Sequence, residues 1–320
     1  MRKILSITMA LGIFVPIITE AHVKWFASAV DTVRPYALTD IPVLISICIG
    51  LCMILAGVSL ERILEVPKWY QNFIEKYAPN ILSVASIGFG LSYIIFSYMG
   101  FVFAPNLPAT GEVGTLLLTL QTIAGLMILL GFFERIGGLL LVVLFILASR
   151  VYGFAEMMDT FEMLGFAVYA MIIGRPKWRI VESVTFSRLM HVFHRFGVSV
   201  LRVGTGINLI ILGFSEKILV PGLTQAFLEE YPWNFMKNIG FDWYTDYWFA
   251  YSAGFAEMLF GIFILLGLVT RTTIIALAVF LISTLMLLGP MELIGHLPHF
   301  SIAAVLLVFG PGSAMHMKKN

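Results

Sequence analysis

Long apolar stretches recur along the whole chain and are separated by short polar segments or by glycine and proline. A run of roughly 20 apolar residues can cross the hydrocarbon core of a bilayer as an α-helix. The pattern therefore predicts an all-α integral membrane protein with about ten transmembrane helices. The predicted helices cover about residues 4–20, 41–60, 81–103, 113–132, 136–150, 160–174, 196–214, 247–268, 272–289 and 298–310.

Composition supports the same class of protein. Of the 320 residues, 59% are hydrophobic and 12% are charged, whereas soluble domains carry about 25% charged residues. The formal net charge of +1 gives no electrostatic reason to expect a nucleic-acid partner. Membrane lipids are the partners that this composition implies.

The Lys and Arg residues between the predicted helices are concentrated on one side of the membrane. Because cytoplasmic loops carry the excess of these residues, we expect a multi-pass protein of the cell (inner) membrane with both termini in the cytoplasm. That orientation holds if residues 1–21 are retained as a helix or signal anchor. The same residues also resemble a signal peptide, with a basic start, an apolar stretch and a cleavage position after Ala21.

The chain also contains an internal repeat, in which segment 125–135 (GLMILLGFFER) matches segment 261–271 (GIFILLGLVTR). Each repeated unit is predicted to cross the membrane four times. Because that number is even, the units are predicted to be parallel rather than inverted repeats. The predicted parts are N-terminal helices in 1–80, a degenerate four-helix unit in 81–177, a basic cytoplasmic linker in 178–196 and a second four-helix unit in 197–312.

Glu257 lies inside an apolar predicted helix and is the main candidate for function. At 1.5 Å per residue it lies about 13 Å below Trp248, near the middle of the membrane on its outer side. Gly254 and Gly261 share its helix face, and such small residues allow a neighbouring helix to approach. We therefore predict that the carboxyl group points into the bundle, where an ionisable group is costly unless it is paired, neutral or in contact with water.

Two interpretations of Glu257 follow from that position. It is either a catalytic residue that handles protons or binds a ligand, or a protonated glutamic acid that bonds to a neighbouring helix. The corresponding residue of the first unit is Gln121, a neutral side chain of similar shape. Gln121 indicates that the polar contact is architectural in both units and that only the second unit gains a titratable group.

Glu216 and Lys217 follow the predicted helix 196–214 at the outer surface and are candidates for ligand binding. They either form the polar rim of a cavity that contains Glu257, or they cap the helix while the lysine extends to the membrane surface. Since they are adjacent in sequence, their side chains point in different directions on a helix and need not pair with each other.

Trp243 and Trp248 belong to a segment rich in aromatic and acidic residues that is inserted into the second unit. This segment either forms a ledge that binds a flat apolar ligand or belongs to the aromatic belt at the membrane surface. Both interpretations place the two tryptophans on the outer side of the membrane.

Glu292, His296 and His299 lie on the same predicted side, and His22 joins them there. These residues form either a local polar cap or a group that binds a ligand or handles protons. His22, His296 and His299 are only weak metal candidates, because two histidines placed around Pro298 have no spacing dedicated to a metal. We therefore expect no metal site.

Four short motifs characterise the second unit: LRVG at 201–204, GFSEK at 213–217, AGFAEMLFG at 253–261 and LGLVTR at 266–271. In these motifs the unit resembles the DoxX-like membrane family, and the resemblance covers residues 197–312. It implies a four-helix bundle, of which the first unit resembles a degenerate copy. Some members of the family are membrane subunits of a thiosulfate:quinone oxidoreductase.

The resemblance supports the fold more than it supports a reaction. Together with the predicted position of Glu257, it leads to the hypothesis of a membrane subunit of a quinone-linked oxidoreductase system that binds a quinone or small apolar ligand in an outward-facing cavity near Glu257. No covalently bound cofactor is expected, so electrons would come from a soluble or membrane-bound redox partner. Whether the chain is an enzyme stays open, since a small-molecule transporter or exporter and a non-enzymatic scaffold or stress protein are alternatives.

Overall fold

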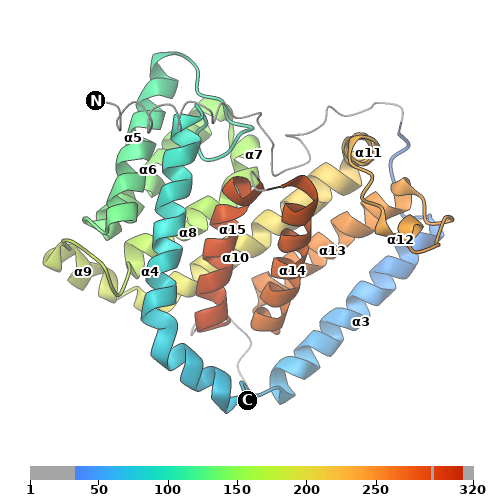
Figure 1. Ribbon diagram of the computed structural model, residues 1–320, viewed down its shortest axis with the longest axis horizontal. Coiled ribbons are helices and arrows are strands. Elements are labelled where there is room, and N and C mark those ends of the chain that lie inside the picture. The colour runs from blue at the N-terminus through green and yellow to red at the C-terminus, as the bar shows by residue number, and fades with distance from the viewer. Residues whose placement is uncertain (1–32, 290–291, 313–320) are drawn as a thin grey trace, which may run out of the picture.

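The computed structural model describes residues 33–289 and 292–312, and every regular element in that part of the chain is a helix (Figure 1). The predicted helix 4–20, the cleavage position after Ala21 and the metal candidate His22 lie outside the described residues. In chain order the helices are α3 (Ile41–Ile63), α4 (Lys68–Tyr98), α5 (Gly111–Leu130), α6 (Glu134–Tyr152), α7 (Phe154–Met157), the 3-10 turn η1 (Met158–Thr160), α8 (Phe161–Ile172), α9 (Val184–His191), α10 (His194–Leu212), the π-helical η2 (Gly213–Leu219), α11 (Pro221–Glu230), α12 (Phe235–Asn238), α13 (Asp246–Leu266), α14 (Thr270–Leu288) and α15 (Glu292–Phe309).

Eight helices of the described part are long and apolar enough to cross a membrane. This finding confirms the prediction of an all-α, multi-pass membrane protein. The predicted helix 160–174 differs, because α8 has only 12 residues and follows the short elements α7 and η1. Gly153, with a φ of 90°, ends α6 and starts this broken segment.

α4 starts earlier and ends earlier than the predicted helix 81–103. At its start the helix includes polar residues and Pro79, which the hydrophobic pattern assigns to a loop. At its end the chain leaves the helix after Tyr98, and residues 100–109 form a compact loop. Phe103 in this loop is fully buried. The apolar pattern continues past Tyr98 because the loop enters the protein core, and not because the helix continues.

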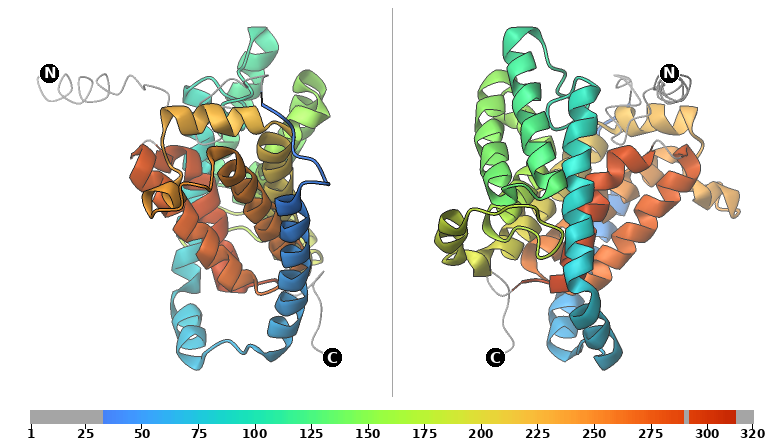
Figure 2. Two further views of the ribbon diagram at one scale, coloured as in Figure 1. Left: turned by 90° about the vertical axis from the view of Figure 1, so that its right-hand side faces the viewer. Right: turned by 60° about the vertical axis from the view of Figure 1, so that its left-hand side comes forward.

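Seven of the eight spanning helices, all but α3, form two groups together with the shorter α8. α4, α5, α6 and α8 pack in succession as the first helix group, and α10, α13, α14 and α15 form the second helix group. Between the groups, α8 packs on α10 and α15 packs on α4, as Figures 1 and 2 show for the latter pair. The last helix of each group therefore packs against the first helix of the other. Two parallel repeats would be arranged in this way, although the repeat itself stays a prediction.

Glycine contacts bring the first two helices of each group close together. A Cβ atom on Gly90 of α4 would lie 2.5 Å from the Leu129 nitrogen of α5. In the second group, a Cβ atom on Gly206 of α10 would lie 2.6 Å from the Leu265 nitrogen of α13. Helices cross at such short distance only where side chains are absent. These crossings set the positions from which the polar residues of each group project.

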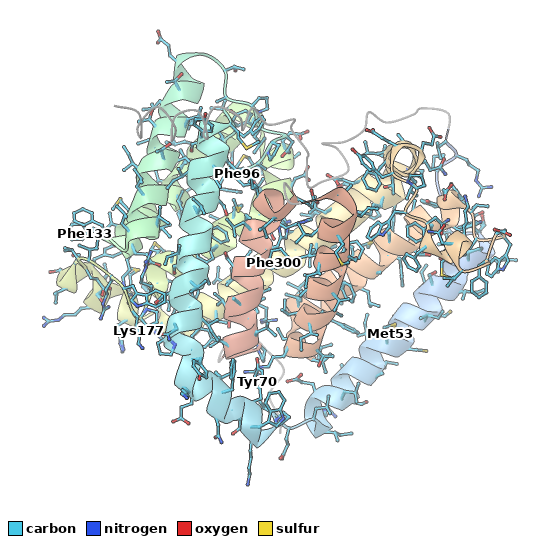
Figure 3. All side chains as sticks on the ribbon, in the orientation of Figure 1. Met53, Tyr70, Phe96, Phe133, Lys177 and Phe300 are labelled. Atoms are coloured by element: carbon cyan, nitrogen blue, oxygen red, sulfur yellow. The ribbon has the colours of Figure 1, made fainter. Side chains whose placement is uncertain are left out.

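α3 packs mainly on α13 and exposes most of its apolar side chains, including Met53, which is labelled in Figure 3. A helix that is apolar all round is suited to contact with lipid on its exposed faces. We refer below to the side of the molecule where α4 and η2 end and α11 lies as the α11 face; it is at the top of Figure 1. It corresponds to the predicted outer side.

Candidate functional site

Lys217 and Glu257 form an ion pair between η2 and α13. Lys217 Nζ lies 2.7 Å from Glu257 Oε2, and the two side chains are 13% and 20% exposed. The pairing offsets part of the free-energy cost of placing either charge between packed helices. The sequence does not predict this pair. In the structure the lysine amine contacts the Glu257 carboxylate instead of extending to the membrane surface.

The local backbone explains how Lys217 reaches Glu257. η2 continues α10 with wider, π-helical turns, a feature that occurs frequently at functional sites. A Cβ atom on Gly213 would lie 2.6 Å from the Gly254 carbonyl oxygen, and one on Gly254 would lie 2.7 Å from Lys217 Cβ. Because both glycines lack a side chain, η2 lies directly against α13 at the level of the ion pair.

Glu216, the neighbour of Lys217, does not lie at a cavity rim as predicted. Its side chain is buried with 1% exposure, and its backbone oxygen lies 3.5 Å from the Thr224 hydroxyl, which donates to it. Adjacent residues point in different directions on a helix, so Lys217 faces the cavity whereas Glu216 does not line it.

A cavity of about 100 Å³ adjoins the ion pair within the second helix group. Its polar lining consists mainly of Lys217, Glu257, Glu292, His296 and His299. The other walls are apolar and aromatic and come chiefly from α11, α13 and α14. They include Phe227, Leu228, Trp233, Phe249, Phe280 and Leu288. The arrangement combines an apolar binding space with a few convergent polar groups, which is typical of small-molecule sites.

The tryptophan at the cavity is not one of those predicted. Trp243 is 71% exposed in the loop before α13. Trp248 packs against Tyr36 and Tyr251, with ring centroids 5.9 Å and 6.0 Å away. Trp233 lines the cavity instead. The structure therefore does not place the predicted ledge residues beside Glu257, because the sequence indicates an aromatic segment but not which ring of it turns inward.

Gln121 occupies a fully bonded position in the first helix group and lines no cavity there. Its Oε1 accepts a hydrogen bond of 2.8 Å from the Phe103 nitrogen. Its Nε2 donates to the Tyr93 carbonyl, the Ser97 hydroxyl and the Phe101 carbonyl over 3.0–3.2 Å. The loop after α4 thus fills the space next to Gln121, whereas the space next to Glu257 is open.

Two imidazole–carboxyl pairs extend the site. His296 Nδ1 lies 3.3 Å from Glu292 Oε1 within α15. His299 Nε2 lies 3.0 Å from Glu162 Oε1, which belongs to α8 of the first helix group. All four side chains are at most 10% exposed. The site is therefore completed by a residue from the other helix group.

Glu162 is a residue that the sequence analysis missed. Glu162 lies in the predicted helix 160–174. A carboxyl group inside an apolar helix needs a partner, and this holds for Glu162 as it does for Glu257. That signal marks Glu162 as notable. Its pairing with His299 joins positions far apart in sequence, and only the three-dimensional structure reveals it.

Acidic groups outnumber permanently basic ones in this site. Glu162, Glu257 and Glu292 face a single lysine, Lys217, so the group carries net negative charge when the imidazoles are neutral. Interacting groups of this kind share protons as a set rather than titrating singly. Within the described residues, no three or more His, Cys, Asp or Glu side chains are grouped to hold a metal ion.

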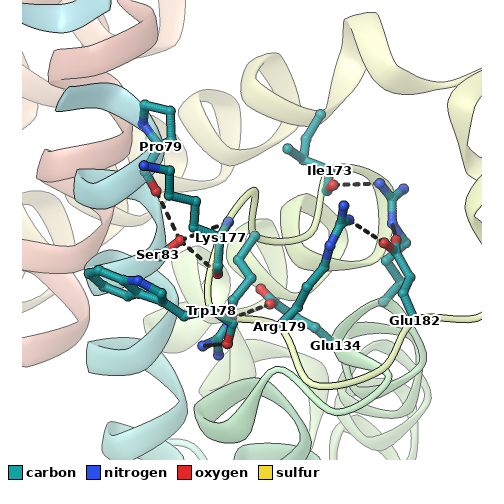
Figure 4. A network of polar contacts seen from close by, with 10 residues as sticks. Pro79, Ser83, Glu134, Ile173, Lys177, Trp178, Arg179 and Glu182 are labelled. Carbon is teal, nitrogen blue, oxygen red and sulfur yellow. Dashed lines mark hydrogen bonds and ion pairs between the residues drawn. The ribbon is translucent and has the colours of Figure 1, made fainter. Parts of the chain in front are cut away.

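A second polar network lies at the opposite face and stabilises the first helix group (Figure 4). Arg175 Nε lies 2.7 Å from Glu134 Oε2, and Arg135 Nε lies 2.5 Å from Glu182 Oε1. Arg135 also donates to the Ile173 carbonyl at the end of α8, at 2.6 Å. Basic side chains at helix ends satisfy carbonyls that lack partners within the helix, so we interpret this network as architectural.

Comparison with known families identifies the segment that carries the ion pair. The family model DoxX matches residues 197–290. No curated protein and no solved structure matches the chain. The match includes Lys217 and Glu257 and stops before His296 and His299. The C-terminal part of this chain, from α10 to the end of α14, is therefore the part that is similar to the DoxX family.

Proposed function

We propose that this chain is a membrane subunit of a quinone-linked oxidoreductase system, and that the cavity beside Lys217 and Glu257 binds the quinone head group or a similar small apolar ligand. The observation that carries the proposal is the lining of that cavity, with an ion pair at one end and aromatic walls elsewhere. The match of residues 197–290 to the DoxX family model supports it, because the resemblance to that family includes membrane subunits of a quinone-linked oxidoreductase.

The cavity residues suit a flat ring that carries carbonyl oxygens. Phe227, Phe249 and Phe280 offer apolar surface for the ring. The Lys217 ammonium can donate a charge-assisted hydrogen bond to a carbonyl oxygen while it stays close to Glu257. The volume of about 100 Å³ is below the roughly 150 Å³ of a cavity that binds benzene. Ring binding therefore requires the aromatic walls to move apart, with any tail lying outside the cavity.

The roles of the chain's own residues follow from this geometry. When bound, a quinone accepts one electron and one proton at each carbonyl oxygen. Lys217 and Glu257 would hold protons next to the ligand, and the aromatic walls would keep bulk water away from it. Electrons would come from a soluble or membrane-bound redox protein, which forms part of the proposal.

The test is a titration of decylubiquinone into the purified full-length protein in lipid nanodiscs. The wild type is compared with Lys217→Met, and with Lys68→Met as a matched charge-removal control, because Lys68 is exposed at the start of α4. We expect saturable binding by the wild type and the control, and binding about 10-fold weaker in Lys217→Met, which corresponds to the loss of about 1.4 kcal/mol. Absence of saturable binding to the wild type contradicts the proposal.

Turnover gives an independent test of Glu257. With a reduced partner protein present, Glu257→Gln should fold and bind decylubiquinone but lose quinone-linked turnover, because the amide cannot release or accept the proton. Turnover equal to that of the wild type would remove Glu257 from the mechanism.

A small-molecule transporter is the second candidate, and one observation favours it. The site lies between two helix groups, since Glu162 of the first meets His299 of the second, and transporter sites form at such repeat interfaces. Uptake of a small molecule into proteoliposomes without any redox partner, lost in Glu257→Gln, would support transport instead of the quinone-linked function.

A further inference from the structure

His299 lines two cavities. On one side it lines the cavity of the Lys217–Glu257 ion pair. On the other side it lines a smaller cavity of about 20 Å³, together with Asp159 and Glu162. Among the described residues, His299 is the one side chain that lines both. A group in this position can exchange protons with either space.

The smaller cavity can hold water. One water molecule needs roughly 10–15 Å³ of this kind of volume and several polar partners. Asp159, Thr160 and Glu162 supply polar groups there. Glu162 Oε2 is buried and has no hydrogen-bond partner among the described residues, so it has an acceptor site available for a water molecule.

The smaller cavity lies near the α11 face. Asp159 is part of η1, which precedes α8 at that end of the first helix group. Glu156, within one turn of Asp159, is exposed. An exposed residue therefore lies within one helical turn of a residue that lines the cavity.

The pairing at His299 is suited to proton transfer. Its Nε2 lies 3.0 Å from Glu162 Oε1, both side chains are at most 10% exposed, and imidazole can take a proton at one ring nitrogen and release it from the other. The charged and titratable groups around the imidazole come from five elements. They are Asp159 from η1, Glu162 from α8, Lys217 from η2, Glu257 from α13, and Glu292 and His296 from α15.

The repeat gives a second argument that the pair is more than packing. At the offset that relates Gly125 to Gly261, His299 corresponds to Met163 and Glu162 corresponds to Pro298. In the predicted repeat, neither member of the pair recurs at the equivalent position of the other unit, so the pair is not a contact that both units share.

We propose that Asp159, Glu162 and His299 form a proton relay between the α11 face and the Lys217–Glu257 cavity. A hydronium ion beside Asp159 gives a proton to the Glu162 carboxylate and is left as a water molecule. Glu162 then passes a proton to His299 Nε2, and His299 releases one from Nδ1 to the cavity, with Glu257 or Glu292 as the acceptor. Each step forms one bond to hydrogen and breaks one, so the charge that enters equals the charge that leaves.

The relay deepens the proposed function, on which it rests for the use of the protons, since reduction of a bound quinone consumes them. The path itself can be tested without any ligand. Full-length protein in nanodiscs is subjected to a rapid drop in pH, and protonation of the cavity carboxylates is followed by time-resolved infrared spectroscopy. The bands of Glu257 and Glu292 are assigned by their loss in Glu257→Gln and in Glu292→Gln.

We expect Glu162→Gln to slow protonation of the cavity carboxylates by about 100-fold, which is the lower end of what one positioned proton-transfer group contributes. The final extent of protonation should be unchanged. Glu162→Asp should restore much of the rate, because it keeps the carboxyl group. His299→Gln should slow the reaction like Glu162→Gln, and Glu156→Gln, the same change at an exposed position, should leave the rate unchanged.

Protonation at the wild-type rate in both Glu162→Gln and His299→Gln would overturn the relay. If Glu162→Gln does not fold, the comparison of His299→Gln with Glu156→Gln decides the question alone. The outcomes are separable from those of the proposed function, because failure of wild-type protein to bind decylubiquinone contradicts that function whatever the infrared rates are.

Discussion

Lys217 Nζ on η2 lies 2.7 Å from Glu257 Oε2 on α13, and both side chains line one cavity. The carboxyl group that interrupts the apolar pattern of α13 is thus compensated by a cation from the neighbouring helix. In the first helix group there is no charge to compensate at the corresponding position, because Gln121 is neutral and its polar atoms are hydrogen-bonded to the protein.

Removal of one partner of the ion pair should destabilise the protein more than removal of both. Lys217→Met leaves a carboxylate unpaired between helices, and we expect a loss of about 2–4 kcal/mol in the free energy of unfolding, slightly less than for a fully buried pair. Lys217→Met combined with Glu257→Gln should lose less than the sum of the single changes, with a coupling of at least about 1 kcal/mol. Unfolding by SDS in mixed micelles measures these values, and strict additivity would show that the pair does not form.

The aromatic wall of the cavity can be tested by comparing two tryptophans from the same segment. Trp233 lines the cavity, whereas Trp243 is 71% exposed. We expect Trp233→Ala to weaken decylubiquinone binding by about 10-fold, since an aromatic contact contributes on the order of 1 kcal/mol. Trp243→Ala should bind like the wild type. Equal effects in the two variants would mean that the ligand binds elsewhere.

The close crossing of α10 and α13 depends on Gly206. A methyl group there would lie 2.6 Å from the Leu265 nitrogen, and backbone atoms cannot move aside, so Gly206→Ala should cost about 1–3 kcal/mol. Gly57→Ala on α3 is the matched control, because its methyl group would lie 3.5 Å from Phe263 Cζ. The control should be neutral or stabilising by about 0.5–1 kcal/mol. A neutral Gly206→Ala would argue against the crossing.

The segment before α3 should respond to acid. Hydrogen bonds from Arg34 and from the Ala37 backbone hold the pKa of Asp40 below its usual value. Because this pKa is lower in the folded state, the stabilisation is complete above the unfolded pKa of about 3.9 and is lost as pH falls through the folded value. Protection of the Ala37 amide from hydrogen exchange should therefore decrease below about pH 4.

Asp40→Asn serves as the control for that experiment. It should lack the acid-dependent change, because the amide does not titrate in this range. The same acid dependence in Asp40→Asn and in the wild type would assign the effect to another group.

The sequence predicts the helices well because length and apolar composition determine which segments enter a bilayer. It fails where apolar residues serve another purpose, as at Phe103, which enters the core from a loop and extends the predicted end of α4. α8 lies within the predicted helix 160–174, but the apolar pattern does not reveal the short elements α7 and η1 that precede it.

The candidate site is predictable only in part. Glu257 is identifiable because a carboxyl group at that depth requires a compensating group. Its partner Lys217 is not identifiable from the sequence. The π-helical turns of η2 change the direction of this side chain, and the apolar periodicity does not reveal such turns. The pair of Glu162 and His299 depends on contact between two helix groups, which a single sequence does not encode locally.

Photolabelling with an azido-quinone in nanodiscs tests the central claim most directly, because it reports where the ring lies. The account predicts that labelled peptides come from α13 and α14 around the cavity, near Phe249 and Phe280, and that excess decylubiquinone suppresses the labelling. Labelling confined to exposed surfaces such as α3, unchanged by decylubiquinone, would contradict the account.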